Sequence, residues 1–178
     1  MLFHLGVLFI FAGHLVGLLT PIVIFDTLGI SHSAKQTLAV VAGGIAGTMA
    51  IVGATLLVHR RLFDPRVRAS SSTTDTLIII LLWVQLFLGL STIPTSLAHL
   101  DGHEMVKFMN WAQGIFTFNP DAASYVADAA LVFKLHLFLG LTIFLLFPFT
   151  RLVHMLSAPI RYIWRPGYQV VRQRNRSA

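Results

Sequence analysis

Four long apolar runs dominate this sequence, and each has about the length of a helix that crosses a membrane. They cover residues 2–24, 38–58, 76–93 and 131–157. An α-helix of about 20 apolar residues spans the hydrocarbon core of a bilayer, where the backbone hydrogen bonds must be made within the protein. The sequence therefore predicts an all-α, integral membrane helical bundle with four transmembrane helices, in a single domain that covers residues 1–178.

Composition agrees with this fold class and excludes several kinds of site. Hydrophobic residues make up 56% of the chain, charged residues only 11%, and the mean hydropathy is +0.77. In soluble domains charged residues approach a quarter. Cysteine is absent, which excludes disulfides, thiolate-bound zinc or iron–sulfur clusters and covalent attachment of a c-type haem. Any metal must therefore be held mainly by histidine.

The distribution of charge predicts the orientation of the chain. All three lysines fall in or beside connections on one side of the predicted bundle, together with most of the acidic residues. The opposite side holds the arginines, which are Arg60, Arg61, Arg66, Arg68, Arg151, Arg161, Arg165, Arg172, Arg174 and Arg176. Basic residues mark the cytoplasmic side of membrane proteins, so the loop at residues 59–75 and the tail at residues 158–178 are expected in the cytoplasm. We expect these basic segments to contact anionic lipid, with no nucleic-acid partner.

Proline and capping residues suggest where the helices end. The first span is expected to end near Pro21, and the third to follow an N-cap at Thr74 or Asp75 and to stop at Pro94. Pro148 is expected to kink the last span. The longest connection, residues 95–128, has apolar residues at helical spacing and predicts an amphipathic helix on the outer surface. These residues are Met105, Phe108, Met109, Trp111, Ala112, Ile115 and Phe116.

Two pairs of histidines lie inside the first and last apolar runs. His4 and His14 are ten residues apart, and His136 and His154 are eighteen apart, which correspond to about 15 Å and about 27 Å along ideal helices. Because two spans separate them, the first and last spans run antiparallel. His14 should therefore face His136 (the outer pair), and His4 should face His154 (the inner pair). Helix tilt and the kink at Pro148 are expected to absorb the unequal separations.

Paired imidazoles at membrane depth favour two b-type haems stacked across the bilayer. Two axial histidines fill both free positions of a haem iron, so such a centre transfers electrons and does not bind substrate. Gly13 and Gly17 beside His14, and Gly140 one turn after His136, would leave flat space for a porphyrin. A proton relay or a transporter site is the main alternative use of histidines in a membrane.

Several motifs resemble the γ subunit of membrane-bound respiratory nitrate reductase, a b-type cytochrome that oxidises quinol. They are FHLGVLFIFAGHLVGLLTP, KQTLAVVAGGIAG, RRLFDPRVRA, LGLSTIP, DGHEM followed by NWAQ, and RLVHMLSAP. The resemblance implies that His4 and His154 ligate an inner haem b, and that His14 and His136 ligate an outer one. It also implies a quinol site near Lys35, within SAKQTL. Family members usually carry one more span before the position of His4, so the resemblance implies that this sequence lacks that helix, which provides no haem ligand.

By the same resemblance, the chain passes electrons from quinol to an iron–sulfur β subunit and then to a molybdenum α subunit that reduces nitrate. It would lie in the inner membrane of a bacterial or archaeal cell, as a multi-pass protein with a cytoplasmic C-terminus, and serve anaerobic respiration and nitrate assimilation. Three alternatives stay open at this point. They are a related cytochrome b of a sulfite or heterodisulfide reductase, a haem-free membrane anchor, and a histidine-based proton or metal transporter.

Overall fold

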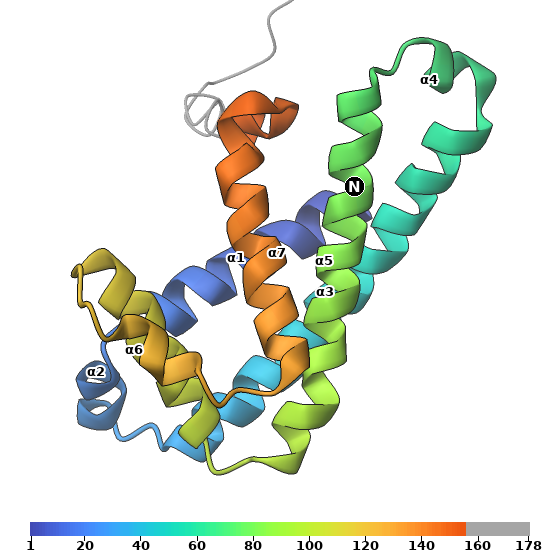
Figure 1. Cartoon of the computed structure of the whole chain (residues 1–178). Coiled ribbons are helices and arrows are strands. Elements are labelled where there is room, and N and C mark those ends of the chain that lie inside the picture. Colours follow the sequence, from blue (N-terminus) through green and yellow to red (C-terminus); the bar gives the residue numbers. More distant parts are fainter. Residues whose placement is uncertain (156–178) are drawn as a thin grey trace, which may run out of the picture.

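The computed structural model describes residues 1–155, which are almost entirely helical and contain no strand. Four helices in this part are long and apolar enough to cross a membrane. They are α1 (Leu2–Leu19), α3 (His32–Phe63), α5 (Thr73–Ala98) and the segment that begins with α7 (Leu131–Leu146) (Figure 1). The predicted all-α membrane bundle is confirmed. The tail predicted at residues 158–178, and the last two residues of the fourth expected span, lie outside the described residues.

The spans pack in chain order, α1 on α3, α3 on α5 and α5 on α7. Glycines bring α1 and α3 into backbone contact. A Cβ at Gly53 would lie 2.5 Å from the backbone nitrogen of Phe3, and one at Gly6 would lie 2.7 Å from that of Ala50. Small residues allow such close approach between helices in lipid. The helix that carries His4 and His14 is therefore held by close packing against α3.

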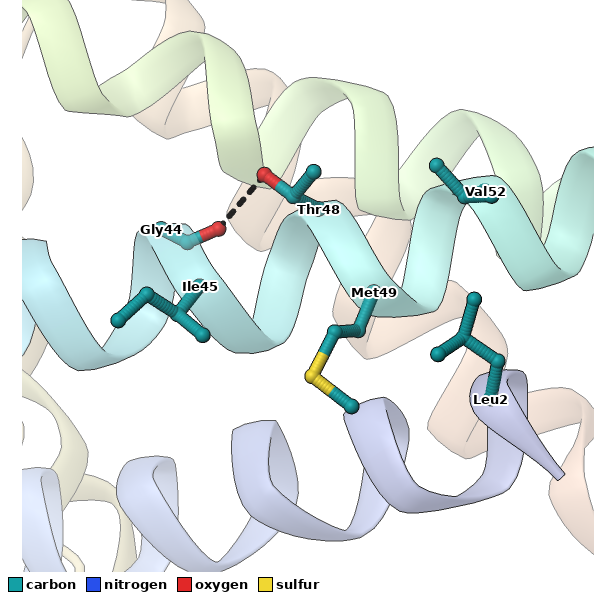
Figure 2. A pocket seen from close by; sticks show the side chains of 6 residues that line it. All are labelled: Leu2, Gly44, Ile45, Thr48, Met49 and Val52. Carbon is teal, nitrogen blue, oxygen red and sulfur yellow. Dashed lines mark hydrogen bonds between the residues drawn. The ribbon is translucent and has the colours of Figure 1, made fainter.

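One face of this helix pair carries an apolar groove (Figure 2). The threonine hydroxyl in the groove donates to the carbonyl of Gly44 at 2.8 Å, which satisfies it within the helix. An apolar surface with its polar groups satisfied in this way suits contact with lipid chains. The residues that line the groove are Leu2, Gly44, Ile45, Thr48, Met49 and Val52.

The first apolar run forms two helices, because α1 ends at Leu19 and the short α2 (Ile22–Thr27) begins after Pro21. The expected single span over residues 2–24 is therefore too long. The second helix is longer than expected at both ends. It starts at His32, where the Ser31 hydroxyl accepts from the Ala34 N–H at 3.1 Å, and it continues through His59 to Phe63.

Two other helix ends differ from the predictions for residues 59–75 and 76–93. The expected loop contains α4 (Pro65–Ala69), which Asp64 caps. The N-cap of α5 is Ser72, not Thr74 or Asp75, and Asp75 completes a capping box as the third helical residue. The helix then passes through Pro94 to Ala98, because a membrane helix tolerates the one hydrogen bond that proline removes.

The last span is broken at Pro148, whereas the prediction was a kinked but continuous helix. The regular helix α7 ends at Leu146, and two 3-10 segments follow, η2 (Phe147–Phe149) and η3 (Arg151–Met155), separated by the extended Thr150. Proline lacks the N–H that would continue the ladder, and the Phe147 N–H bonds the Phe144 carbonyl instead. His154 therefore lies on η3 and not on α7.

The predicted amphipathic helix is confirmed as α6 (His103–Phe116), followed by η1 (Ala122–Val126). It packs against α1, and Gln113 Nε2 donates to the carbonyls of Leu18 at 3.0 Å and Thr20 at 3.3 Å. These two carbonyls belong to the last turn and the C-cap of α1, where carbonyls lack partners within a helix. We call this the α6 end of the bundle, and the opposite end, with α4 and η3, the α4 end (Figure 1).

An ion-pair network ties α6 to the segment that leads into α7. Lys107 Nζ lies 2.9 Å from Glu104 Oε1 and 2.8 Å from Asp128 Oδ2. These partners raise the pKa of Lys107 to about 12, Asp128 first, and Lys107 in turn lowers the pKa of Asp128. The network is exposed enough that its contribution to stability is small.

The pKa shifts predict a pH window for this tether. A lowered carboxyl pKa stabilises the fold above the ordinary value of about 4 and ceases to do so as pH falls through the shifted value. A raised lysine pKa stabilises the fold below about 10.4 and ceases to do so as pH rises through about 12. We expect Lys107→Met to lower the thermal unfolding temperature by a constant amount from about pH 5 to about pH 10, with the difference shrinking beyond both limits. An unchanged difference at pH 3 would mean that the pair with Asp128 contributes nothing.

Candidate functional site

His14 on α1 and His136 on α7 come together, with His14 exposed and His136 half-buried. Their ring centroids lie 6.2 Å apart, with 46° between the ring planes. The two residues come from the first and last spans, although the main packing contacts run in chain order, α1 on α3, α3 on α5 and α5 on α7. The outer pair expected from the antiparallel order of the spans is thus one that the structure brings together.

The distance between the two ring centroids of the outer pair is compatible with one metal ion between two imidazoles. Metal–nitrogen bonds of about 2 Å place the two coordinating nitrogens about 4 Å apart, and each ring centroid lies beyond its nitrogen. The Nδ1 atom of His14 lies 2.8 Å from the carbonyl of Ile10. This hydrogen bond puts the proton on Nδ1 and leaves the lone pair on Nε2, as in most histidine ligands. The Nδ1 atom of His136 is buried and has no hydrogen-bond partner within residues 1–155.

Neighbouring small and polar residues shape the space around this pair. A Cβ at Gly89 of α5 would lie 3.0 Å from Cε1 of His136, so only glycine leaves the ring its present position. Gln85, one turn earlier, donates to the backbone carbonyl of His136 at 3.1 Å. Within the described chain, a Cβ at Gly13 or Gly17 would meet no atom within 4 Å. A flat group could therefore approach α1 beside His14, as expected. The space expected at Gly140 is not free, because a Cβ there would lie 3.0 Å from Nε2 of Gln85.

Sequence reasoning missed Gly89 and Gln85 as parts of this site. They stand four residues apart in an apolar run and therefore lie on one face of a helix. A glutamine in the middle of a membrane helix is costly unless it is bonded. That cost is the signal that would have identified Gln85.

The inner pair is not assembled in the same way. The ring of His4 packs edge-on against Phe3, with centroids 5.4 Å apart, and His154 Nδ1 bonds the carbonyl of Arg151. Both histidines are exposed, as His14 is, but no ring contact between them exists within residues 1–155. The break at Pro148 explains the difference, because His154 does not continue the helix that carries His136.

Lys35 lies on α3 and is buried at the α6 end. It contacts α1 about one turn after His14. Its Nζ donates to the carbonyl of Gly17 at 3.1 Å and to the sulfur of Met109 at 2.8 Å, and it lies 3.7 Å from the centroid of the Phe25 ring. Four helices thus meet at one ammonium group. Such a buried donor is a suitable partner for an oxygen of a ligand that enters beside α6.

At the α4 end, a buried carboxylate links three elements. Asp75 Oδ1 lies 3.0 Å from Arg151 Nε, and Asp75 Oδ2 lies 3.8 Å from Arg61 Nη2. The side chain of Asp75 is only 6% exposed, whereas that of Arg151 is 77% exposed. The start of α5 is thereby joined to the end of α3 and to η3.

Fold and site define a class. This is a multi-pass helical membrane protein in which the first and last spans hold a pair of facing imidazoles, and no cluster of three or more metal-ligating side chains exists within residues 1–155. The family model of the nitrate reductase gamma subunit matches residues 1–174, and the chain belongs to that family. It is therefore one subunit of a multi-subunit oxidoreductase.

Individual relatives agree over nearly the whole chain. The respiratory nitrate reductase 1 gamma chain of Escherichia coli (strain K12) is 48% identical over 174 residues, which cover 98% of this chain and 76% of that protein. The respiratory nitrate reductase 2 gamma chain of the same organism is 51% identical over 97% of this chain and 76% of its own length. The nitrate reductase gamma chain of Bacillus subtilis (strain 168) is 40% identical over 98% and 77%.

Proposed function

We propose that this chain is the cytochrome b subunit of a membrane-bound respiratory nitrate reductase, which oxidises quinol and delivers the electrons to partner subunits. The observation that carries the proposal is the outer pair, in which His14 and His136 face each other at 6.2 Å from two different spans. The family supports the assignment to nitrate reductase. Within residues 1–155 no group of three or more His, Cys, Asp or Glu side chains is placed to hold a metal ion.

Four histidines would hold two haems b, the outer pair at the α6 end and the inner pair, His4 and His154, at the α4 end. Haem held by two histidines would supply one-electron transfer. The carbonyl of Ile10 sets the tautomer of His14. Gly89 leaves room for the ring of His136, and Gln85 holds its backbone carbonyl. For the inner pair, the proposal requires that His4 and His154, whose rings make no contact within residues 1–155, come to face each other.

Quinol would bind at the α6 end, beside Lys35. The ammonium group can donate a hydrogen bond to a quinol oxygen, and its place one turn from His14 brings that oxygen near the outer pair. Met109 and Phe25 now contact Nζ, and they would give the quinol ring an apolar surround. Protons from quinol would leave on this side, which we assign to the outside of the membrane.

The α4 end would face the cytoplasm and the partner subunits. It carries Arg60 and Arg61 in the last turn of α3 and Arg66 and Arg68 on α4, as expected for a cytoplasmic side. We propose an iron–sulfur β subunit as the electron acceptor and a molybdenum α subunit as the site of nitrate reduction. This chain itself would not touch nitrate.

The quinol site is tested by Lys35→Met, which keeps the apolar stem of the side chain and removes the charge. We expect the rate of haem reduction by a quinol analogue to fall about tenfold or more, since a hydrogen bond from a charged group contributes about 1.5–3 kcal/mol. The dithionite-reduced spectrum should stay unchanged. The measurement is stopped-flow absorbance of the haems in the purified chain after mixing with the quinol analogue.

Lys107→Met is the matched control, because Lys107 lies on α6 but bonds only to Glu104 and Asp128. The haems of the Lys107→Met variant should be reduced by the quinol analogue at the same rate as those of the unaltered chain. Equal rates in Lys35→Met and the unaltered chain would place the quinol site elsewhere. A chain that binds haem but accepts no electrons from quinol would contradict the proposed function itself.

A further inference from the structure

We propose that Asp75 is a positioning residue for His154. Its buried carboxylate fixes the side chain of Arg151, and the backbone carbonyl of Arg151 fixes the imidazole of His154. This inference rests on the proposed function, because it takes His154 as a haem ligand. It concerns how the α4 end keeps that ligand in place after the break in the last span.

The carboxylate of Asp75 is held firmly by its own helix. Its Oδ2 atom accepts the Ser72 N–H at 3.2 Å, and the Ser72 hydroxyl accepts the Asp75 N–H at 3.1 Å. This capping box fixes the side chain at the N-terminus of α5, where the helix dipole favours a negative charge. The other oxygen, Oδ1, is thereby left to bond Arg151.

Arg151 is the link between α5 and η3. Its Nε atom lies 3.0 Å from Oδ1 of Asp75, across a gap of 76 positions in the sequence. The regular helix has already ended at Leu146, so η3 does not continue α7 and its position is not set by that helix. The ion pair with α5 supplies a fixed point for the segment that carries His154.

The same arginine orients His154. The Nδ1 atom of His154 bonds the backbone carbonyl of Arg151, which puts the proton on Nδ1 and leaves Nε2 as the ligand atom. A carboxylate, an arginine and an imidazole are thus connected in series. Movement of the arginine changes the orientation of the ring.

Charge explains why a buried acid is required here. Arg61 Nη2 also approaches Asp75 Oδ2, at 3.8 Å, so one carboxylate lies between two guanidinium groups. Without its charge the two arginines repel each other, and an unpaired buried charge is strongly destabilising. Arg151, which is exposed, is the one free to move away. Its displacement would take η3 and His154 with it.

The simpler role for Asp75, a helix cap alone, can be separated from this one. Asp75→Asn keeps a side-chain oxygen for the Ser72 N–H but removes the charge that pairs the arginines. Ser72→Ala removes the hydroxyl of the cap and keeps the carboxylate. The experiment compares these two variants in the full purified chain, by redox titration and low-temperature EPR of both haems. The signal of the inner pair is identified in His14→Ala, where only that haem should remain.

We expect Asp75→Asn to shift the midpoint potential and the EPR signal of the inner haem while those of the outer haem stay unchanged. Ser72→Ala should leave both haems unchanged, and Asp75→Glu should restore most of the original signal. Arg151→Gln should reproduce the shift, and the double variant Asp75→Asn/Arg151→Gln should add nothing further, since both changes break one link.

An unchanged inner haem in Asp75→Asn, or an equal shift in Ser72→Ala, would overturn the proposal. If Asp75→Asn does not assemble, Arg151→Gln decides alone, because it leaves the capping box intact, and an unchanged inner signal in that variant overturns the link. A chain that never contains haem would overturn the proposed function first. A chain with two haems and no response to these substitutions would overturn only the role of Asp75.

Discussion

Replacing His14 by alanine should lower the haem content of the purified chain from about two per chain to about one. The ring centroids of His14 and His136 lie 6.2 Å apart, and within residues 1–155 no other ring pairs with either imidazole. A haem that loses one of its two axial ligands in a membrane interior loses affinity and its low-spin spectrum. His136→Ala should give the same result, because both changes remove the same centre.

Double variants make this prediction specific. His14→Ala/His136→Ala should retain the one remaining haem, whereas His14→Ala/His4→Ala should lose both. His99→Ala is the control, because His99 is the C-cap of α5 and its imidazole bonds the carbonyl of Thr95. The measurement is the reduced-minus-oxidised spectrum with a haem-to-protein ratio. Two haems left in His14→Ala, or loss of the second haem in His14→Ala/His136→Ala, would show that the pairing is wrong.

A change at Gly53 should have a still broader effect, with loss of both haems. A Cβ there would lie 2.5 Å from the backbone nitrogen of Phe3 and 2.7 Å from its Cα, and backbone atoms cannot rotate away as side chains do. Overpacking of this kind typically costs about 1–3 kcal/mol. Gly53→Ala should therefore push α1, with His4 and His14, away from α3. The expected readout is a lower thermal unfolding temperature together with a haem content well below one per chain.

Gly43→Ala is the matched control on the same helix, because within the described chain a Cβ at Gly43 would meet no atom within 4 Å. Alanine is also the better helix former, so this variant should keep both haems and unfold no earlier than the unaltered chain. Full haem content in Gly53→Ala would mean that α1 does not need its close contact with α3.

The sequence allowed the number of spans and the amphipathic helix to be predicted, since both depend on apolar length and period. Helix ends were less predictable. Ser72, not Asp75, caps α5 because the capping box uses two residues three apart, and Pro94 continues its helix while Pro148 ends another. A single sequence gives proline the same local penalty at both places. The neighbouring helices and segments decide between the two outcomes.

The candidate site, like the fold, could be predicted from the sequence only in part. The order of the spans was enough to pair His14 with His136, because antiparallel helices place the outer halves of both runs together. It was not enough to describe the inner pair, since the break after Leu146 changes where His154 lies. The contacts of Lys35 with Gly17 and Met109 join positions 18 and 74 apart, and no local pattern predicts such contacts.

The haem-to-protein ratio of the unaltered chain, measured as pyridine haemochrome after purification in mild detergent, tests the central claim most directly. The proposal that four histidines hold two haems predicts a ratio of two, with the absorbance of b-type haem. A ratio of zero in a folded, helical preparation would contradict the claim and leave a haem-free anchor or transporter as the interpretation. A ratio of one, lost in His14→Ala, would restrict haem binding to the outer pair and contradict the role given to His4 and His154.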